Sequence, residues 1–160
     1  LFALGGGTGA REINQLITNS LDELEDFEII HVTGPERDGS KARRLAKQYS
    51  NYHVVEFLEK NIKHAYIIAD VVVCRAGFST LTELSALQIP AVLVPKEGHQ
   101  EDNAEIFSQS NQFINFKESN LKLTKAIEQL RRNEQIENKT LQITSRIKIQ
   151  NIVNNLLKFN

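Results

Sequence analysis

Short apolar runs rich in β-branched residues alternate with amphipathic helical periods along this sequence, and no other feature limits the fold as strongly. Strands are predicted at Leu1–Leu4, Phe27–Val32, Tyr52–Phe57, Val71–Cys74, Ala91–Val94 and Phe113–Phe116. Helices are predicted between them, among others at Lys41–Gln48, Asn61–Ala69 and Thr80–Leu87, and two more follow Leu121 with a polar break near Asn133–Lys139. Short strands separated by helices are typical of a parallel sheet covered on both faces. The sequence therefore predicts one α/β domain over residues 1–160, built on a doubly wound, Rossmann-like parallel sheet.

The segment with the most chemical information covers residues 74–84. It leaves a predicted buried strand, turns at Gly77, and reaches Ser79 and Thr80 where a hydroxyl-capped helix is expected to begin. Unpaired N–H groups and the positive end of the helix dipole make such a turn a site for anions. Glu83, one turn inside, is placed to accept hydrogen bonds from the hydroxyls of a ligand whose phosphates lie at the helix end. The segment also fits an ordinary helix start, in which Thr80 and Glu83 form a capping box.

A glycine-rich loop, Gly5-Gly6-Gly7-Thr8-Gly9-Ala10, joins the first predicted strand to the first helix. Its spacing satisfies the G-x-G-x-x-G/A pattern of dinucleotide-binding folds. A NAD enzyme also needs a carboxylate at the end of the second strand, but here that strand runs into Thr33-Gly34-Pro35. A P-loop is excluded because no Gly-Lys-Ser/Thr follows. The loop indicates either a phosphate contact without NAD or a tight turn that needs glycine for packing.

Composition narrows the functional classes. The net charge is −1 and the 19 Lys and Arg are spread along the chain, so no overall basic field favours nucleic acid. The single cysteine, Cys74, excludes an internal disulfide, fits a reducing compartment and is expected to be an inert core thiol. No apolar run approaches the ~20 residues of a membrane span. Because the sequence lacks methionine and opens as if within a strand, we interpret it as a piece of a longer protein.

Polar residues elsewhere are weaker candidates. His31, His53 and His64 fall in predicted strands or a helix and are expected to be packed or surface residues. The sequence has no Asp-x-Asp motif and no cluster with metal-ligand spacing, so neither a metal nor a cofactor is expected. Arg75 is interpreted either as a cation that neutralises phosphate or as one partner of a structural ion pair. The basic residues of segment 41–47 are expected to form a solvated helix face, with an acidic membrane surface as the alternative.

Several motifs in a fixed order carry a resemblance to a known family. They are Gly5-Gly6-Gly7-Thr8-Gly9-Ala10-Arg11, Glu56-Phe57-Leu58, Ala69-Asp70-Val71-Val72-Val73-Cys74-Arg75-Ala76-Gly77, Thr80 with Glu83, Pro90-Ala91-Val92-Leu93-Val94-Pro95, and Gln100-x-x-Asn103-Ala104. In this order and spacing the chain resembles the C-terminal domain of the MurG-type N-acetylglucosaminyltransferases, which complete the lipid-linked disaccharide precursor of peptidoglycan. The similarity runs from residue 3 to about residue 104, and its most specific part is Arg75–Glu83 together with Gln100–Asn103.

The resemblance implies one half of a two-domain GT-B glycosyltransferase. That enzyme would transfer N-acetylglucosamine, with inversion, from UDP-N-acetylglucosamine to a lipid-linked muramoyl-peptide acceptor. The N-terminal half, which binds the acceptor and contacts the membrane in this family, is absent from the sequence. No catalytic residue is therefore expected in this chain, which alone would bind donor without turning it over. The full-length protein is expected in the cytoplasm, at the inner face of the cell membrane.

The resemblance also implies roles for individual residues at the nucleotide. The backbone of Leu58 would contact the uracil, and Glu83 would hold the ribose hydroxyls. Ser79 and Thr80 would meet the diphosphate at the helix end. Each role suits the chemistry, because a carboxylate accepts hydroxyl protons and helix N–H groups hold phosphate.

Further residues are implied at the two sugars. Gln100, with His99 beside it, would reach the hydroxyls of the donor sugar, while Gly7 and Thr8 would face the acceptor. The family often has serine and glutamine at the positions of Gly7 and Thr8. The predicted substrate-binding set is completed by Gly77, Phe78 and Asn103.

Two other functions fit the same residues. One is a different GT-B transferase that acts on a glycolipid or a small-molecule acceptor. The other is a non-catalytic nucleotide-sugar subunit that works only when docked to a second chain, as split relatives of the family do. A NAD-dependent oxidoreductase is a more distant alternative.

Overall fold

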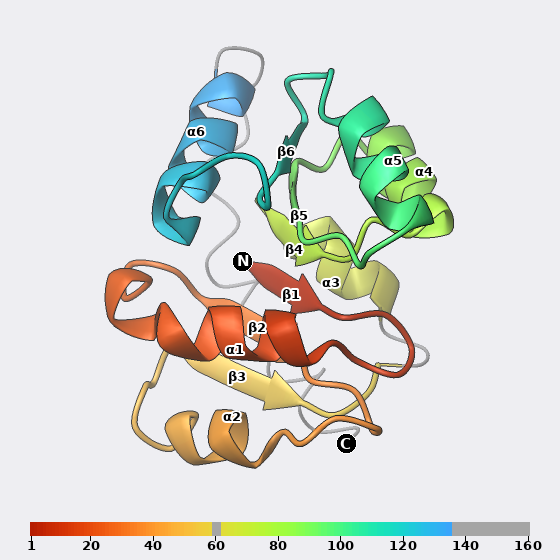
Figure 1. The fold of residues 1–160 in the computed structure, drawn as a ribbon. Helices are drawn as coiled ribbons and strands as arrows, with labels where there is room; N and C mark the ends of the chain where they lie inside the picture. Colours follow the sequence, from red (N-terminus) through yellow and green to blue (C-terminus); the bar gives the residue numbers. More distant parts are fainter. Residues whose placement is uncertain (59–61, 136–160) are drawn as a thin grey trace.

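The computed structural model describes residues 1–58 and 62–135. Within them lie the strands β1 (Phe2–Leu4), β2 (Ile29–Val32), β3 (Tyr52–Val55), β4 (Val72–Cys74), β5 (Ala91–Leu93) and β6 (Phe113–Asn115). The helices are α1 (Arg11–Asn19), α2 (Ser40–Leu45), α3 (Ile62–Ile68), α4 (Phe78–Ala86), α5 (His99–Phe107) and α6 (Leu123–Gln135), with a 3₁₀ turn η1 (Leu21–Glu23) after α1 (Figure 1). The predicted alternation of strands and helices is confirmed.

The strands form one parallel sheet in the order β3-β2-β1-β4-β5-β6. β1 is central, since Phe2 lies opposite both Ile30 of β2 and Val72 of β4. The chain builds outward from β1 to β3, then returns to place β4 on the other side of β1. In open α/β sheets, ligands bind at the carboxyl ends of strands where the order reverses in this way. The predicted doubly wound, Rossmann-like sheet is confirmed, and its reversal lies between β1 and β4.

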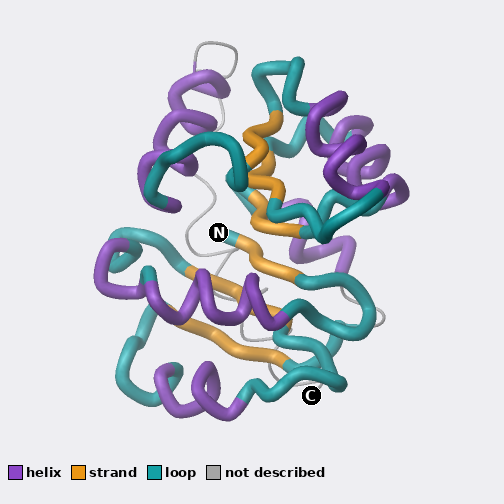
Figure 2. Tube along the Cα trace, viewed as in Figure 1, coloured by secondary structure: helices purple, strands orange, loops and turns teal. Residues whose placement is uncertain are grey.

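Both faces of the sheet are buried, as the apolar strands predicted. In β1, Phe2 and Leu4 pack into a core cluster shared with α3, α4 and α5. Ala3, between them, packs into a second cluster shared with α1, α2 and α6. Successive side chains of a strand point to opposite faces, so three helices cover each side of the sheet (Figure 2).

Several predicted boundaries are wrong by one to three residues. β3 ends at Val55 rather than Phe57, whose side chain is 44% exposed. The next apolar residue, Leu58, is buried in the core cluster that includes α3. α2 ends at Leu45 rather than Gln48. α6 confirms the first predicted C-terminal helix and runs to Gln135. Most of the predicted break and the second helix lie outside the described residues.

A buried chain of polar groups connects α1, β2 and β3. The Nδ1 atom of His31 lies 2.6 Å from the Tyr52 hydroxyl, and its Nε2 lies 3.0 Å from Oδ1 of Asn14. The Asn14 amide nitrogen donates to the Thr33 carbonyl at 3.1 Å. Nε2 of His31 therefore carries the proton and Nδ1 accepts from Tyr52. Burial lowers the pKa of His31 to about 4, which keeps the imidazole neutral. His31 is thus packed, one of the two places expected for it, but its polar partners were not predicted.

None of the helices in residues 1–58 and 62–135 has the length and apolar character needed to cross a membrane.

Candidate functional site

The predicted site loops meet at the carboxyl edge of the sheet. β1 leads into the glycine-rich loop 5–10, its neighbour β4 leads into residues 75–77, and β5 leads into residues 94–98 (Figure 1). α4 and α5 begin directly after the second and third of these loops. The strand reversal is thus flanked by the glycine-rich loop on one side and two helix N-termini on the other.

The glycine-rich loop has a packed part and an open part. Gly9 and Gly34 both have a φ of +84°, and a Cβ atom on either would collide with backbone atoms of the other loop. Gly7 and Thr8 are exposed, and a Cβ atom on Gly7 would meet nothing within 4 Å. The packing interpretation of the loop therefore holds for Gly9. Gly7 and Thr8 lie open at the carboxyl edge, and their contact with an acceptor stays a prediction.

α4 begins at Phe78, two residues before the predicted start. Its N-cap is Gly77, in an extended conformation, and no side chain caps the helix. The predicted hydroxyl cap is therefore wrong, and so is the alternative of a capping box between Thr80 and Glu83. The first helical bond runs from the Leu81 N–H to the Gly77 carbonyl.

The turn before α4 is held from a distant part of the chain. The Asn103 amide nitrogen, on α5, donates to the Ala76 carbonyl at 3.0 Å. This bond anchors the turn that leads into α4. The N–H groups of Phe78, Ser79 and Thr80 precede the first helical bond and point out of the helix end. Together with the helix dipole they create positive potential there.

Glu83 is directed toward this helix end by Ser79. The Ser79 hydroxyl donates to Oε1 of Glu83 at 3.3 Å, across one turn of α4. Both side chains are exposed. The structure thus places a carboxylate and a hydroxyl on the same side of α4, close to its free N–H groups.

Arg75 is held by two oxygen atoms. Its Nη1 donates to the Val94 carbonyl at 2.9 Å and lies 2.6 Å from Oε2 of Glu12. The structural ion pair that the sequence left open is therefore present. The alternative role of Arg75, contact with phosphate, stays a prediction.

α5 begins at His99, and the loop over residues 94–98 joins it to the end of β5. Gly98 precedes the helix with a φ of +92°, and its N–H donates to Oε2 of Glu101 at 3.1 Å. The hydrogen bond from Lys117 lowers the pKa of Glu101, and the Gly98 N–H lowers it further. Gln100 accepts the Lys96 N–H at 3.0 Å. The amide oxygen of Gln100, which was predicted to contact the donor sugar, thus forms a hydrogen bond within the loop that precedes α5.

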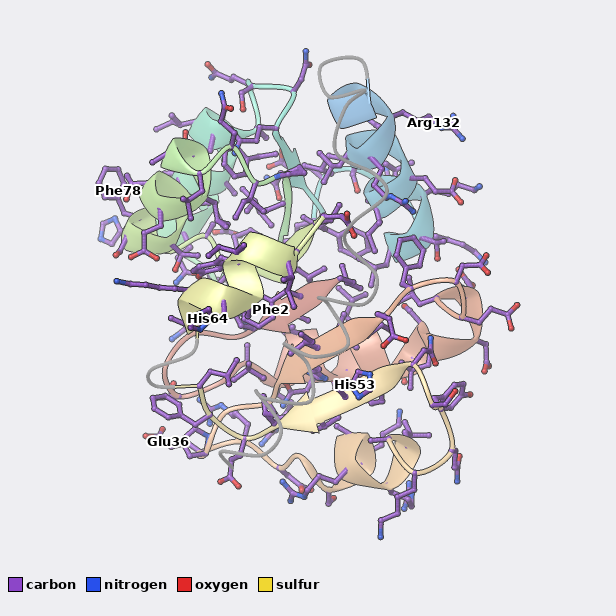
Figure 3. The ribbon with its side chains drawn as sticks, turned by 180° about the vertical axis from the view of Figure 1, so that it is seen from behind. Phe2, Glu36, His53, His64, Phe78 and Arg132 are labelled. Atoms are coloured by element: carbon purple, nitrogen blue, oxygen red, sulfur yellow. The ribbon has the colours of Figure 1, made fainter. Side chains whose placement is uncertain are left out.

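Two predicted residues differ in their burial. Phe78 is 64% exposed and lies edge-on to Phe107, with ring centroids 6.3 Å apart (Figure 3). Leu58 follows β3, two strands from β1, and its side chain is in the core. Only the backbone of Leu58 is therefore open to the predicted contact. The exposed or half-exposed members at the carboxyl edge are Gly7, Thr8, Gly77, Phe78, Ser79, Thr80, Glu83, His99, Gln100 and Asn103.

Among the described residues, no group of three or more His, Cys, Asp or Glu side chains is arranged to hold a metal ion. Cys74 is buried, and burial raises the pKa of its thiol to about 12. The prediction of an unreactive core thiol is confirmed by this environment.

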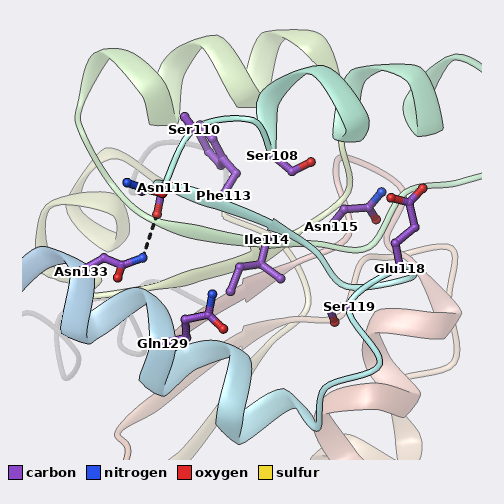
Figure 4. A pocket seen from close by; sticks show the side chains of 10 residues that line it. All are labelled: Ser108, Ser110, Asn111, Phe113, Ile114, Asn115, Glu118, Ser119, Gln129 and Asn133. Atoms are coloured by element: carbon purple, nitrogen blue, oxygen red, sulfur yellow. Dashed lines mark hydrogen bonds between the residues drawn. The ribbon is translucent and has the colours of Figure 1, made fainter.

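A hollow of about 280 Å³ lies away from the predicted site, between β6, α6 and the end of α5 (Figure 4). Its lining is mostly neutral and polar, and it includes Asn115 and Gln129 but no predicted site residue. Oδ1 of Asn115 is buried without a hydrogen-bond partner. A buried oxygen without a partner carries a desolvation cost that no hydrogen bond offsets.

Comparisons with known proteins agree with the geometry. The family described as "Glycosyltransferase family 28 C-terminal domain" matches residues 1–156. Two similar proteins are named UDP-N-acetylglucosamine--N-acetylmuramyl-(pentapeptide) pyrophosphoryl-undecaprenol N-acetylglucosamine transferase. The one from Myxococcus xanthus is 34% identical over 142 residues, which cover 82% of this chain and 37% of the relative. The one from Staphylococcus haemolyticus is 35% identical over 140 residues, which cover 84% of this chain and 38% of the relative.

A solved structure shows the same fold. The crystal structure of Acinetobacter baumannii MurG matches with a TM-score of 0.58 and 23% identity, covering 99% of this chain and 49% of that one. The chain thus spans well under half the length of the curated relatives that it matches. The resemblance to the MurG-type enzymes and the GT-B half-fold are confirmed. With nearly its whole length matched, the chain belongs to the glycosyltransferase family 28 C-terminal domains.

Proposed function

We propose that this chain is the donor-binding half of an inverting glycosyltransferase that adds N-acetylglucosamine from UDP-N-acetylglucosamine to a lipid-linked muramoyl-peptide acceptor. Relatives that are 34% and 35% identical to this chain carry the transfer of N-acetylglucosamine in their names. In this proposal residues 1–160 form one domain, and the acceptor-binding half with its general base lies outside them. The whole protein would work in the cytoplasm, at the inner face of the cell membrane.

The observation that carries the proposal is the arrangement at the start of α4. The N–H groups of Phe78, Ser79 and Thr80 precede the first helical bond, and Ser79 directs Glu83 toward them. Helix N-termini bind phosphate, and a carboxylate one turn inside accepts protons from ribose hydroxyls. A nucleoside diphosphate carries both kinds of group, phosphate oxygens and ribose hydroxyls.

The arrangement also supplies what the departing group needs. An acceptor hydroxyl, deprotonated by a base outside this chain, attacks the anomeric carbon, and the bond from that carbon to the diphosphate oxygen breaks. Negative charge then grows on the diphosphate, and UDP leaves. The end of α4 stabilises this charge in the way that a metal ion does in other enzymes.

Calorimetry of the purified chain with UDP, UDP-N-acetylglucosamine, UDP-glucose and NAD tests the proposal. We expect weak binding of the uridine ligands and none of NAD. Glu83→Ala removes a charged hydrogen-bond acceptor, so the free energy of UDP binding falls by about 1.5–3 kcal/mol, roughly a 10- to 150-fold loss of affinity. Glu105→Ala is the matched control, because Glu105 is an exposed glutamate of α5 outside the predicted site. Parental affinity in a folded Glu83→Ala protein would remove Glu83 from the site.

Donor binding is expected to need no divalent cation, because the predicted site offers a helix end rather than a carboxylate pair. The same titration in excess chelator measures this. A chelator that abolishes UDP binding would contradict the proposal for α4.

A further inference from the structure

The cations of this chain divide into those with and those without carboxylate partners. Among the described residues, the Lys and Arg side chains in ion pairs with carboxylates all lie from residue 75 onward: Arg75, Lys117, Lys122, Lys125 and Arg132. Between residues 11 and 47 of the same described part, the cations form no ion pair: Arg11, Arg37, Lys41, Arg43, Arg44 and Lys47. Most of these unpaired cations belong to α2 and the turn that follows it.

The unpaired cations of α2 occupy one side of the helix. Ala42 is buried in the core, and Leu45 and Ala46 pack partly against it. At roughly 100° per residue, the positions of Lys41, Arg43, Arg44 and Lys47 fall together on the remaining arc. All of these four side chains are exposed. We name this surface the α2 basic face, defined as Lys41, Arg43, Arg44 and Lys47.

Within residues 1–58 and 62–135, no carboxylate forms an ion pair with the α2 basic face. Asp38, just before α2, accepts the Ser40 N–H at 2.8 Å. That bond lowers the pKa of Asp38, and Arg43 and Arg11 contribute. At the other end, Asp22 accepts the Tyr49 hydroxyl. Lys41 is bonded to a neutral amide oxygen, that of Asn19, at 2.7 Å.

α2 lies at the rim of the molecule, beside the edge strand β3 (Figure 1). Its inner side packs against α1 and β3, which leaves the basic face turned outward. The surface is a convex helix side with closely spaced cations, and it holds no aromatic side chain on which a nucleic-acid base could stack. An extended anionic surface therefore complements the α2 basic face better than a single-stranded or duplex nucleic acid does.

We infer that the α2 basic face is a contact surface for an anionic lipid bilayer. Clustered Lys and Arg on an amphipathic helix are attracted to acidic headgroups, and this attraction weakens with salt. The choice of a bilayer rests on the proposed function, whose acceptor is lipid-linked. A net charge of −1 means that the attraction is local to this face.

Sedimentation of the chain with vesicles tests this inference. Vesicles of phosphatidylcholine alone are compared with vesicles of phosphatidylcholine and phosphatidylglycerol, at low and at high salt. We expect binding only to the mixed vesicles and only at low salt. The variant Lys41→Gln, Arg43→Gln, Arg44→Gln, Lys47→Gln is expected to lose at least about tenfold in vesicle affinity, since each cation contributes.

The control removes the same charge elsewhere: Lys117→Gln, Lys122→Gln, Lys125→Gln, Arg132→Gln. It is expected to bind vesicles as the parent does. Equal losses in both variants, no binding to mixed vesicles, or stronger binding to duplex DNA or polyglutamate would each overturn the inference. UDP titration of the same proteins separates the two proposals. If the α2 variant still binds UDP, it is folded. If the parent chain binds vesicles but not UDP, only the proposed function is contradicted.

Discussion

Arg75 and Glu12 are joined across the point where the strand order reverses, with Nη1 of Arg75 lying 2.6 Å from Oε2 of Glu12. Arg75 follows β4, and Glu12 is in the first turn of α1. The same Nη1 also donates to the Val94 carbonyl, beyond the end of β5. The arginine side chain is 17% exposed and the glutamate 66%. The two partners therefore differ in what their loss should cost.

Arg75→Ala is expected to lower the free energy of unfolding by about 2–3 kcal/mol, because it leaves the partly buried Val94 carbonyl without its donor. Glu12→Gln should cost less than about 1 kcal/mol, since its carboxylate is largely solvated. Urea denaturation measures both. Arg132→Ala, which breaks an exposed ion pair with Glu128, serves as a control and should resemble Glu12→Gln. Equal costs for Arg75 and Glu12 would show that the Val94 bond contributes little.

Gln100 is expected to contribute to discrimination between donor sugars. Its amide oxygen holds the Lys96 N–H, so the variant Gln100→Ala should both loosen the loop and remove a sugar contact. A site built on such bonds penalises an epimer by leaving polar groups unpaired. Calorimetry should therefore show a narrower gap between UDP-N-acetylglucosamine and its galacto epimer. Thr80→Ala is the comparison, because it should weaken both donors equally. If Gln100→Ala loses the same affinity for both donors, Gln100 does not contact the sugar.

His31 should make stability depend on pH. Its pKa is about 4 in the folded chain because of burial, against about 6.5 when unfolded. The unfolded chain therefore binds more protons between these values, and stability is lost as pH falls from 6.5 to 4. The loss from this group approaches about 3 kcal/mol at the lower end. Urea denaturation across this range measures it.

Two variants separate His31 from the other acid-sensitive groups. His31→Leu should reduce the slope of stability against pH, although it also lowers stability by unpairing Asn14 and Tyr52. His64→Gln removes an exposed imidazole on α3 (Figure 3) and should keep the parental slope. An unchanged slope in His31→Leu would assign the acid sensitivity to other residues.

Asn115→Leu is expected to stabilise the chain by about 1 kcal/mol. Its Oδ1 is buried without a partner, and replacing an unsatisfied polar group by an apolar one of similar shape removes a desolvation cost. Asn111→Leu changes an exposed residue of the same hollow (Figure 4) and should alter stability by less than roughly 0.5 kcal/mol. Thermal unfolding of both variants measures the difference. Destabilisation by Asn115→Leu would indicate that a solvent molecule satisfies this oxygen.

The order of the elements was predictable because strand and helix periods are local properties of the sequence. The start of α4 was not. Local preferences favour a hydroxyl at the N-cap, so the sequence placed the start at Thr80. The structure begins the helix at Phe78, and the turn before it is anchored by Asn103, 27 residues from Ala76. A long-range bond of this kind leaves no mark on the local pattern.

The chain from Asn14 to His31 to Tyr52 escaped prediction for the same reason. Its members are separated by 17 and 21 residues and belong to three elements. One signal was present: Asn14 stands beside Ile13 and Ile17 on the apolar side of α1, and His31 stands within a buried strand. Polar residues in such places need hydrogen-bond partners. The sequence indicates this need but does not show which residues meet it.

The contact between Gly9 and Gly34 determines which positions of the glycine-rich loop tolerate substitution and which do not. Because each glycine presses its backbone against the other, no second mutation at one position can relieve a side chain introduced at the other. Gly6 and Gly7 face open space, although the φ of +83° at Gly6 still favours glycine there. Gly7 and Thr8 are thus the places where the loop accepts new side chains without moving its anchor. A mutational library that tests the predicted acceptor contact should randomise this pair and keep the contact between Gly9 and Gly34 intact.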